Sequence, residues 1–507
     1  MHNTVESRDL ISVLRRFSPQ SADVISQHLD MPAGEYAKHV FINPSTNSNI
    51  DIAGSIKEIL VKTFRQHAQS YFEDVNVWRK LNEGKYHPLD VTLLSEQATN
   101  EFSANAIFLT TAHTELDINP VEFYPKALYL SAARAHKQKF LPMRSSSIVK
   151  MAESIRGIPD HDNKNAAFQF GPNIVRAPSG VRTVALAKNG SPILIDRSRR
   201  TAVSNIHSNQ QPADINFCLV PPRQSREAFD NIPSILKSSF NNVADILRAI
   251  PSQDSAIQAF RMGNIALWHE VLNSELDVLP VQLDHRFDID FSRSLLLQEG
   301  GIFREILSSY DNACLLQDSY KKAMKGTFKI DDPEKMSTIY RDGTDFFWDI
   351  TGEKEIRAMR VSPQGLVSTS TSSNLVLPYD PDIIAEKLKN HEISPSLFMV
   401  FAPLAAAECV TLGGSVQIAY QPAIRHTLAE YMKATDRNSC SERLSKSDFN
   451  RWGQYIMDWS EYFDLKGERS ELTLNDISAM YSSKSIRDTS DNLSLIRQKN
   501  IGNYLQL

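Results

Sequence analysis

The sequence predicts an α/β protein whose core is an open, mostly parallel sheet, with helical additions at the N-terminal and C-terminal ends. Residues 106–110 form a short apolar, β-prone run, followed by a polar loop and, beyond Pro120, by a stretch with helical spacing. Further β-prone pieces occur at 165–235 and at 346–368, where the pattern alternates like a hairpin around Thr351-Gly352. Strand, loop and helix in this order open a parallel sheet, which binds ligands at the carboxyl ends of its strands.

The composition is that of an ordinary globular protein. Hydrophobic residues make up 41% of the 507 residues and charged residues 23%, so the chain can bury a large core without metal or disulfide support. The formal net charge of -5 gives no general attraction to nucleic acid or to an anionic membrane. Neither is expected as a partner.

Cysteine usage and hydropathy favour the cytoplasm. No stretch approaches the roughly eighteen apolar residues of a membrane-spanning helix, and the first residues lack the apolar core of a signal peptide. Cys218, Cys314, Cys409 and Cys440 are far apart and form no cluster with histidine, so no metal site is expected. Cys409 lies in an apolar run, which predicts a buried, inert thiol.

Residues 1–100 are expected to form a helical accessory region. Asp51 is placed to cap a helix in which Ile56, Leu60 and Phe64 recur at helical spacing. No residue of this region suggests chemistry.

The α/β core is expected to span residues 101–435. It includes a small β insertion near 165–235, where Asn189-Gly190 is a hairpin signal. Residues 237–325 have a helical pattern, and residues 436–507 are expected to form a helical tail.

The polar loop after the first strand is the first candidate site. Thr110, Thr111 and His113 lie in this loop, and Tyr124 and Lys126 fall on the following helix. Hydroxyl groups and free backbone N–H groups at a helix N-terminus can hold a carboxylate or a phosphate. Histidine can act as an acid or a base near neutral pH. The alternative is a loop whose hydroxyls only cap the helix.

A glycine pair forms the second candidate site. The pattern here predicts an apolar helix, a turn at Gly413-Gly414 and a further helix that carries Gln417 and Tyr420. Two glycines permit positive φ and a close approach of the backbone to a ligand, to which Gln417 and Tyr420 would hydrogen-bond. The alternative is a helix C-cap followed by a new helix start.

A third polar group surrounds His285. Spacing of two along a strand would place Asp288 and Asp290 on one face, and Asp284 and Arg286 on a shared face, which suggests a metal site. However, no glycine-turned loop or clear fourth ligand follows, and Arg286 opposes a cation. A solvated surface joined by salt bridges is the favoured interpretation.

Several catalytic signatures are missing from the sequence. No GxGxxG follows a strand, and GxxxxGK[ST], GxSxG and HExxH do not occur. A conventional dinucleotide fold and a P-loop enzyme are therefore not expected. The cofactor stays undetermined, and ATP or another nucleotide is compatible with the candidate loops.

Two segments together resemble the cysteine-adding enzyme family of bacillithiol biosynthesis. In that family a strand leads into a TGQQ-type loop and then a helix with a Tyr-Lys pair, and AIFLTTAHTEL followed by FYPKALYLSAA is similar. The family's later SPN, apolar helix, Gly-rich turn and I-A-Y series is similar to SSNLVLP, SLFMVFAPLAAAECV and LGGSVQIAYQP. FFWDITGEKEIRAM resembles the preceding hairpin. The chain departs from the family at TAHT, in place of a Gly-Gln-Gln core, and at LPMRSSSIVK, in place of an acidic segment.

The resemblance implies a nucleotidyltransferase-like Rossmannoid core with a cleft that joins an amino acid or an activated acyl group to a small polar acceptor. The residues that would line this cleft are Thr110, His113, Tyr124, Lys126, Gly413, Gly414, Gln417 and Tyr420. His113 or Lys126 would manage charge or protons. The expected function is a biosynthetic ligase or transferase that forms a C–N bond on a small molecule, and a homodimer is compatible with it. A non-catalytic metabolite-binding relative and an interaction protein working through residues 1–100 are the alternatives.

Overall fold

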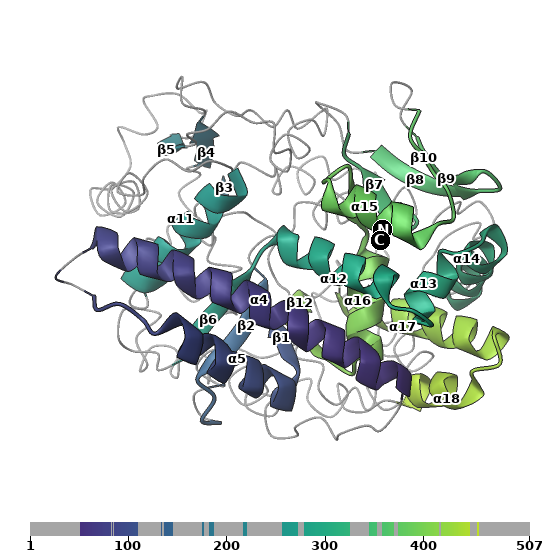
Figure 1. Ribbon diagram of the computed structural model, residues 1–507, viewed down its shortest axis with the longest axis horizontal. Coiled ribbons are helices and arrows are strands. Elements are labelled where there is room, and N and C mark those ends of the chain that lie inside the picture. Colours follow the sequence, from purple (N-terminus) through teal and green to yellow (C-terminus); the bar gives the residue numbers. More distant parts are fainter. Residues whose placement is uncertain are drawn as a thin grey trace, which may run out of the picture.

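A computed structural model describes the parts of the chain on which the fold rests. These are residues 51–82, 84, 86–109, 133, 136–144, 175–176, 182–186, 216–220, 256–271, 278–324, 344–351, 357–369, 374–414, 417–446 and 454–455. They form ten helices and thirteen strands, and the strands make three sheets (Figure 1).

One sheet pairs its described strands only in the parallel sense, in the order β13-β12-β1-β2-β6. The strands are β1 (Ile107–Leu109), β2 (Phe140–Arg144), β6 (Leu279–Leu283), β12 (Val410–Gly414) and β13 (Gln454–Tyr455). Its ladders are short. Among the described residues, β1 meets β2 at one pair, Leu109 with Met143, and only β2 and β6 pair over five positions.

The other two sheets are antiparallel. A curled sheet has the order β10-β9-β8-β7-β11, and a smaller one the order β3-β4-β5. The strands of the curled sheet are β7 (Phe347–Asp349), β8 (Arg357–Ser362), β9 (Gly365–Ser368), β10 (Val376–Leu377) and β11 (Ile393–Pro395). Those of the smaller sheet are β3 (Val175–Arg176), β4 (Arg182–Leu186) and β5 (Asn216–Val220). The pairing of β7 with β8 confirms the hairpin predicted around Thr351.

The predicted fold class, an open and mostly parallel sheet with a Rossmannoid core, is wrong. Eight of the thirteen described strands lie in antiparallel sheets, and the parallel ladders are short. The chain is a mixed α/β protein with a curled antiparallel sheet as a main element. The physical reason is that a short apolar run predicts a buried strand but not its partner or its direction, which tertiary packing decides.

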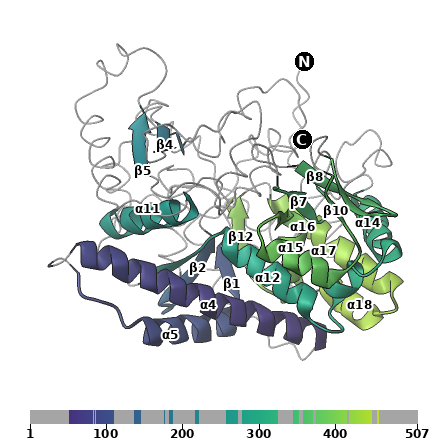
Figure 2. The same ribbon diagram turned by 45° about the horizontal axis from the view of Figure 1, so that its top comes forward.

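Two long helices cover one face of the parallel sheet (Figure 2). They are α4 (Asp51–Leu81) and α5 (Val91–Asn105). Phe72 of α4 packs edge-on against Phe140 of β2, and Phe102 of α5 lies against Phe108 of β1. Successive side chains of a strand point to opposite faces of the sheet. The face covered by α4 and α5 is therefore the one that carries Phe108 and Phe140.

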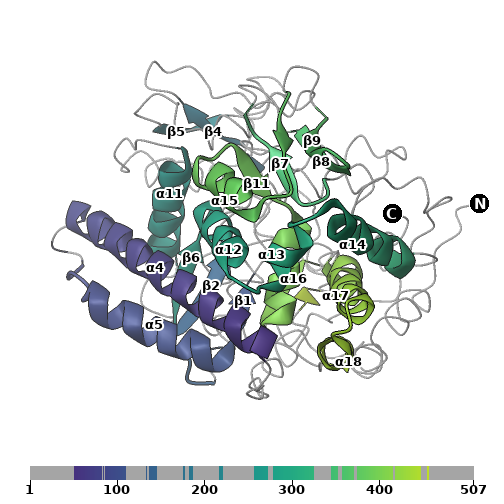
Figure 3. The same cartoon turned by 45° about the vertical axis from the view of Figure 1, so that its right-hand side comes forward.

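Eight further helices lie in the described part of the chain. They are α11 (Ala256–Val271), α12 (His285–Leu297), α13 (Ile302–Ile306), α14 (Tyr310–Met324), α15 (Pro381–Lys389), α16 (Leu397–Ala406), α17 (Gln417–Ala434) and α18 (Asn438–Lys446). Figure 3 shows α12 between α4 and α15, which belong to the two sides of the molecule that hold the parallel and the curled sheet. Helix α12 therefore joins the two halves of the core.

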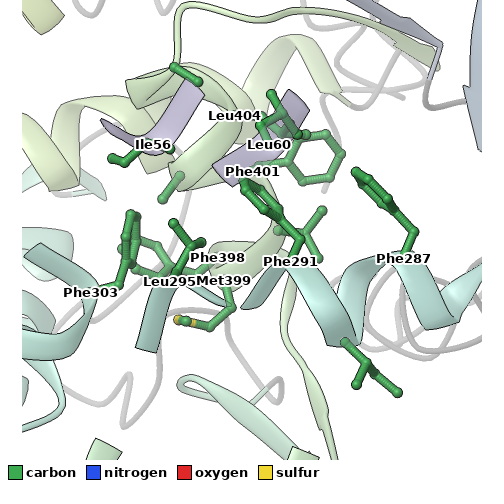
Figure 4. Packing of buried hydrophobic residues seen from close by; sticks show 14 of the residues in the cluster. Ile56, Leu60, Phe287, Phe291, Leu295, Phe303, Phe398, Met399, Phe401 and Leu404 are labelled. Carbon is green, nitrogen blue, oxygen red and sulfur yellow. The ribbon is translucent and has the colours of Figure 1, made fainter. Parts of the chain in front are cut away.

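The core is one continuous cluster that extends from α4 to α18. Figure 4 shows its centre, where side chains of α12, α13 and α16 meet the start of α4. The labelled residues are Ile56, Leu60, Phe287, Phe291, Leu295, Phe303, Phe398, Met399, Phe401 and Leu404. Apolar burial on this scale is the main stabilising term of the fold, at about 25 cal/mol for each Å² removed from water.

Local predictions from the sequence have mixed outcomes. The helix predicted from Asp51 is confirmed, because α4 begins there and buries Ile56, Leu60 and Phe64. The wholly helical pattern predicted for 237–325 is wrong, since β6 interrupts it. The boundaries at 100 and 435 stay predictions.

Candidate functional site

The carboxyl ends of the parallel strands are brought to one edge of their sheet. After β1, the chain adds β2 and then β6 on one side of β1, and later adds β12 and β13 on its other side. The strand order therefore reverses between β1 and β12. In parallel sheets a crevice for ligands forms at this switch point, outside the carboxyl ends of the two strands.

Register places the end of β1, where the first predicted loop begins, beside the end of β12. Leu109, the last residue of β1, lies opposite Leu412 of β12. The chain therefore leaves β1 toward the loop at 110–114 beside the position where β12 reaches Gly413 and Gly414. Parallel strands lie about 4.8 Å apart, so the two exits are neighbours.

The residues of the first candidate loop lie outside the described residues. These are Thr110, Thr111, His113, Tyr124 and Lys126. The structure places only β1, the strand that directly precedes their segment.

The second candidate site differs from its prediction. A strand, β12, separates the apolar helix α16 from the glycine pair, so Gly413 and Gly414 do not follow a helix or cap one. They are the last two residues of β12 and pair with Gln454 and Tyr455 of β13. Gln417 opens α17 and Tyr420 lies on its first turn. The reason is that the β-prone run 409–412 is too short to separate from an apolar helix by pattern alone.

Asp284 stands at the carboxyl end of β6 and caps α12. Its carboxylate accepts a hydrogen bond from the backbone N–H of Arg286 at 2.9 Å and from the Arg286 Nε at 3.0 Å. Arg261 of α11 donates to the same carboxylate through Nη1 at 3.1 Å. Burial alone would raise the pKa of Asp284, but the nearby charges of Arg286 and Arg261 outweigh it and lower the pKa far below its usual range.

Arg261 is a buried cation held from three sides. Its Nε lies 2.8 Å from Asp74 of α4, and its guanidinium lies 5.7 Å from the centre of the Tyr71 ring. The side chain of Arg261 is only 1% exposed. Two arginines and two aspartates therefore balance one another where α4, α11 and α12 meet, which makes this group a structural clamp.

The strand interpretation of 284–290 is wrong. These residues cap and open α12, so Asp288 and Asp290 do not share a strand face. Asp290 instead binds Nε2 of His67 on α4 at 2.9 Å. In the part of the chain that the structure describes, no group of three potential metal ligands is close enough to hold an ion. The predicted salt bridges are present, but most are buried rather than solvated because the helix turns them toward α4 and α11.

Ser394, His285 and Asp288 form a second polar group, between α12 and β11. Nε2 of His285 lies 2.9 Å from Oγ of Ser394, and its Nδ1 lies 3.9 Å from Asp288. A serine, a histidine and an aspartate are the residue types of a nucleophile, a base and an orienting acid. However, Ser394 has no exposed surface, and 3.9 Å exceeds hydrogen-bond length. We interpret the group as a tie between α12 and the curled sheet.

Sequence reasoning missed two polar residues at this edge, Arg261 and Gln282. Arg261 lies within an apolar helix pattern, and Gln282 lies in a strand that the pattern did not reveal. A charged or amide residue inside an otherwise apolar stretch is the signal that could have singled them out, because such residues are rarely buried without a partner.

Comparison with protein-family models and with curated protein sequences finds no match to this chain. Among the described helices, none has the length and apolar composition needed to cross a membrane.

Proposed function

We propose that the chain is a small-molecule biosynthetic enzyme that joins an amino acid or an activated acyl group to a small polar acceptor through a C–N bond. One observation supports the location of the site. The pairing of Leu109 with Leu412 brings the end of β1 beside the glycine pair that ends β12. The kind of reaction rests on the resemblance to the cysteine-adding enzyme family.

The neighbouring groups have distinct roles in this proposal. Helix α17 is eighteen residues long and begins three residues after Gly414, so the N–H groups of its first turn have no partner within the helix and its N-terminus carries a partial positive charge. These groups, with Thr110 and Thr111, would hold the carboxylate or phosphate of the substrate. Gly413 and Gly414 keep the strand end free of side chains that would block the ligand.

Proton transfer falls to the loop after β1. His113 is the proposed acid or base, because imidazole titrates near neutral pH, and Lys126 would balance the developing negative charge. Gln417 at the start of α17 and the Tyr124 and Tyr420 hydroxyls would orient the acceptor by hydrogen bonds. Positioning of two reactants in this way is a major source of rate enhancement in group transfer.

A direct test combines a product screen with two variants and two controls. The protein is incubated with the twenty amino acids, ATP and Mg²⁺, and a panel of amines and amino sugars, and conjugates are detected by mass spectrometry. His113→Ala and Gln417→Ala should each lower turnover by about 10² or more. His87→Ala and Gln66→Ala are matched controls at exposed positions and should retain it.

Three results are distinguishable. Loss of product in both site variants, with unchanged circular dichroism, supports the site. Equal turnover in all four variants rejects it. Amino acid binding by calorimetry without any product identifies a non-catalytic metabolite-binding protein, which the missing acidic segment would also explain.

A further inference from the structure

Gln282 is a buried polar residue in the parallel sheet. It is the fourth residue of β6, it has no exposed surface, and it directly precedes Leu283 and the capping residue Asp284. Within the described part of the chain, no hydrogen-bond partner is present for either its Oε1 or its Nε2. Buried carboxamides are nearly always bonded, so this group calls for an explanation.

Register assigns Gln282 to a face of the sheet. It lies opposite Met143 of β2, which lies opposite Leu109 of β1, which in turn lies opposite Leu412 of β12. Residues in register in a parallel sheet share a face. Gly414, two residues after Leu412, shares this face too.

This face is the one opposite α4 and α5. The alternate residues Phe108, Phe140 and Leu283 belong to the main hydrophobic cluster with those helices, whereas Leu141 and Met143 are buried outside it. The Gln282 carboxamide is therefore directed away from the structural core and shares its face with the glycine end of β12.

A second buried donor lies near the same strand end. Arg261 is bound to Asp284, two residues after Gln282, and its Nη2 has no hydrogen-bond partner among the described residues. A buried donor or acceptor left unpaired costs free energy, and an apolar residue would serve packing better than a carboxamide at position 282. Arg261 is held by Asp74 and Tyr71 of α4, whereas the Gln282 carboxamide faces away from α4, so Gln282 is the group for which a ligand would complete the hydrogen bonds.

We infer that Gln282 is a ligand-binding residue of the proposed site at the carboxyl ends of the parallel strands, and that it pairs with a planar group that has a hydrogen-bond donor beside an acceptor. This inference rests on the proposed function, for which it defines the substrate class. Adenine and a primary carboxamide both have this edge, and glutamine side chains pair with adenine in two-bond fashion. Gln282 lies three strands from β12, or about 14 Å. That separation favours adenosine monophosphate, with its phosphate near α17, over free L-glutamine.

The test compares two isosteric variants. Gln282→Met removes a carboxamide without a described partner, and Gln317→Met removes one that donates to Asp345 at 2.8 Å. Gln282→Met should unfold at the same or a higher temperature than the wild type, whereas Gln317→Met should unfold at a lower temperature. Calorimetric titrations use adenosine monophosphate and, separately, L-glutamine. For one of the two probes, Gln282→Met should bind about tenfold more weakly than the wild type or worse, and a tenfold loss of affinity equals about 1.4 kcal/mol.

The outcomes separate this inference from the proposed function. If neither probe binds the wild type, or Gln282→Met binds both as the wild type does, the inference is overturned. If His113→Ala and Gln417→Ala lose turnover while Gln282→Met keeps its affinity, only this inference fails. Should Gln282→Met not fold, a crystal structure of the wild type with the bound probe decides, because a carboxamide without contact to the probe refutes the assignment.

Discussion

Replacing Arg261 by methionine is the sharpest test of how the fold is held together. Methionine keeps most of the length of the arginine side chain and its contact with Tyr71, so the change removes mainly the charge and its hydrogen bonds. Loss of one member of a buried ion pair usually costs about 3 to 5 kcal/mol. Here Asp284 retains Arg286, and the Asp74 side chain is 17% exposed, so both remaining carboxylates keep some compensation.

We therefore expect a loss near 3 kcal/mol, at the lower end of that range. Arg65→Met is the matched control. Arg65 and Glu96 are 3.0 Å apart, close to the 2.8 and 3.1 Å of the Arg261 ion pairs, but both of their side chains are more than half exposed. That exposed pair should contribute less than about 1 kcal/mol. The difference between the two variants isolates burial as the cause.

Urea unfolding followed by tryptophan fluorescence measures both changes, since Trp78 and Trp268 are buried on α4 and α11. The double variant Arg261→Met with Asp284→Asn should lose less than the sum of the single variants, because the partners act together. An Arg261→Met midpoint no lower than that of Arg65→Met would refute the clamp.

Three further predictions concern local features. Burial, aided by the charge of Arg79, lowers the pKa of His269 to about 4. The stability that neutral His269 provides is therefore complete above about pH 6.5, and the free energy of unfolding falls by roughly 2 to 3 kcal/mol as the pH drops to 4. In urea titrations at pH 7 and pH 4.5, His269→Phe should lack this loss. Gly365→Ala should lower the melting temperature far more than Gly300→Ala, because only at Gly365 would the new Cβ meet a backbone carbonyl, at 2.1 Å; equal shifts would contradict this. A fluorophosphonate probe should leave Ser394 unlabelled in mass spectrometry, and labelling would disprove its buried, structural role.

The sequence predicts elements with a strong local pattern better than it predicts which strands pair. The helix predicted from Asp51 has an apolar stripe over several turns, and α4 begins at Asp51 and buries that stripe. Strands of two to five residues, such as β6, β11 and β13, present too few positions for a period to emerge. The direction in which strands pair depends on contacts far away along the chain, so the mixture of parallel and antiparallel sheets had no local signature.

The candidate site was predictable in part for the same reason. The positions of β1 and of the glycine pair follow from local pattern, and the register of Leu109 with Leu412 then makes them neighbours. A period of two at 284–290 predicts a strand, whereas Asp284 before an apolar stripe is an N-cap signal and predicts the helix that is present. A single capping residue decides between the two readings, and only the structure shows it bonded to Arg286 N–H.

Helix α12 explains why these polar groups are buried at all. Its capping residue Asp284 follows β6 and binds Arg261 of α11, its first residue His285 binds Ser394 of the curled sheet, and Asp290 binds His67 of α4. A purely apolar helix in this position could slide or rotate against its neighbours at little cost, because apolar contacts are not directional. Hydrogen bonds and ion pairs fix one rotation of α12. That rotation sets the end of β6, and with it the position of Gln282 relative to the glycine end of β12.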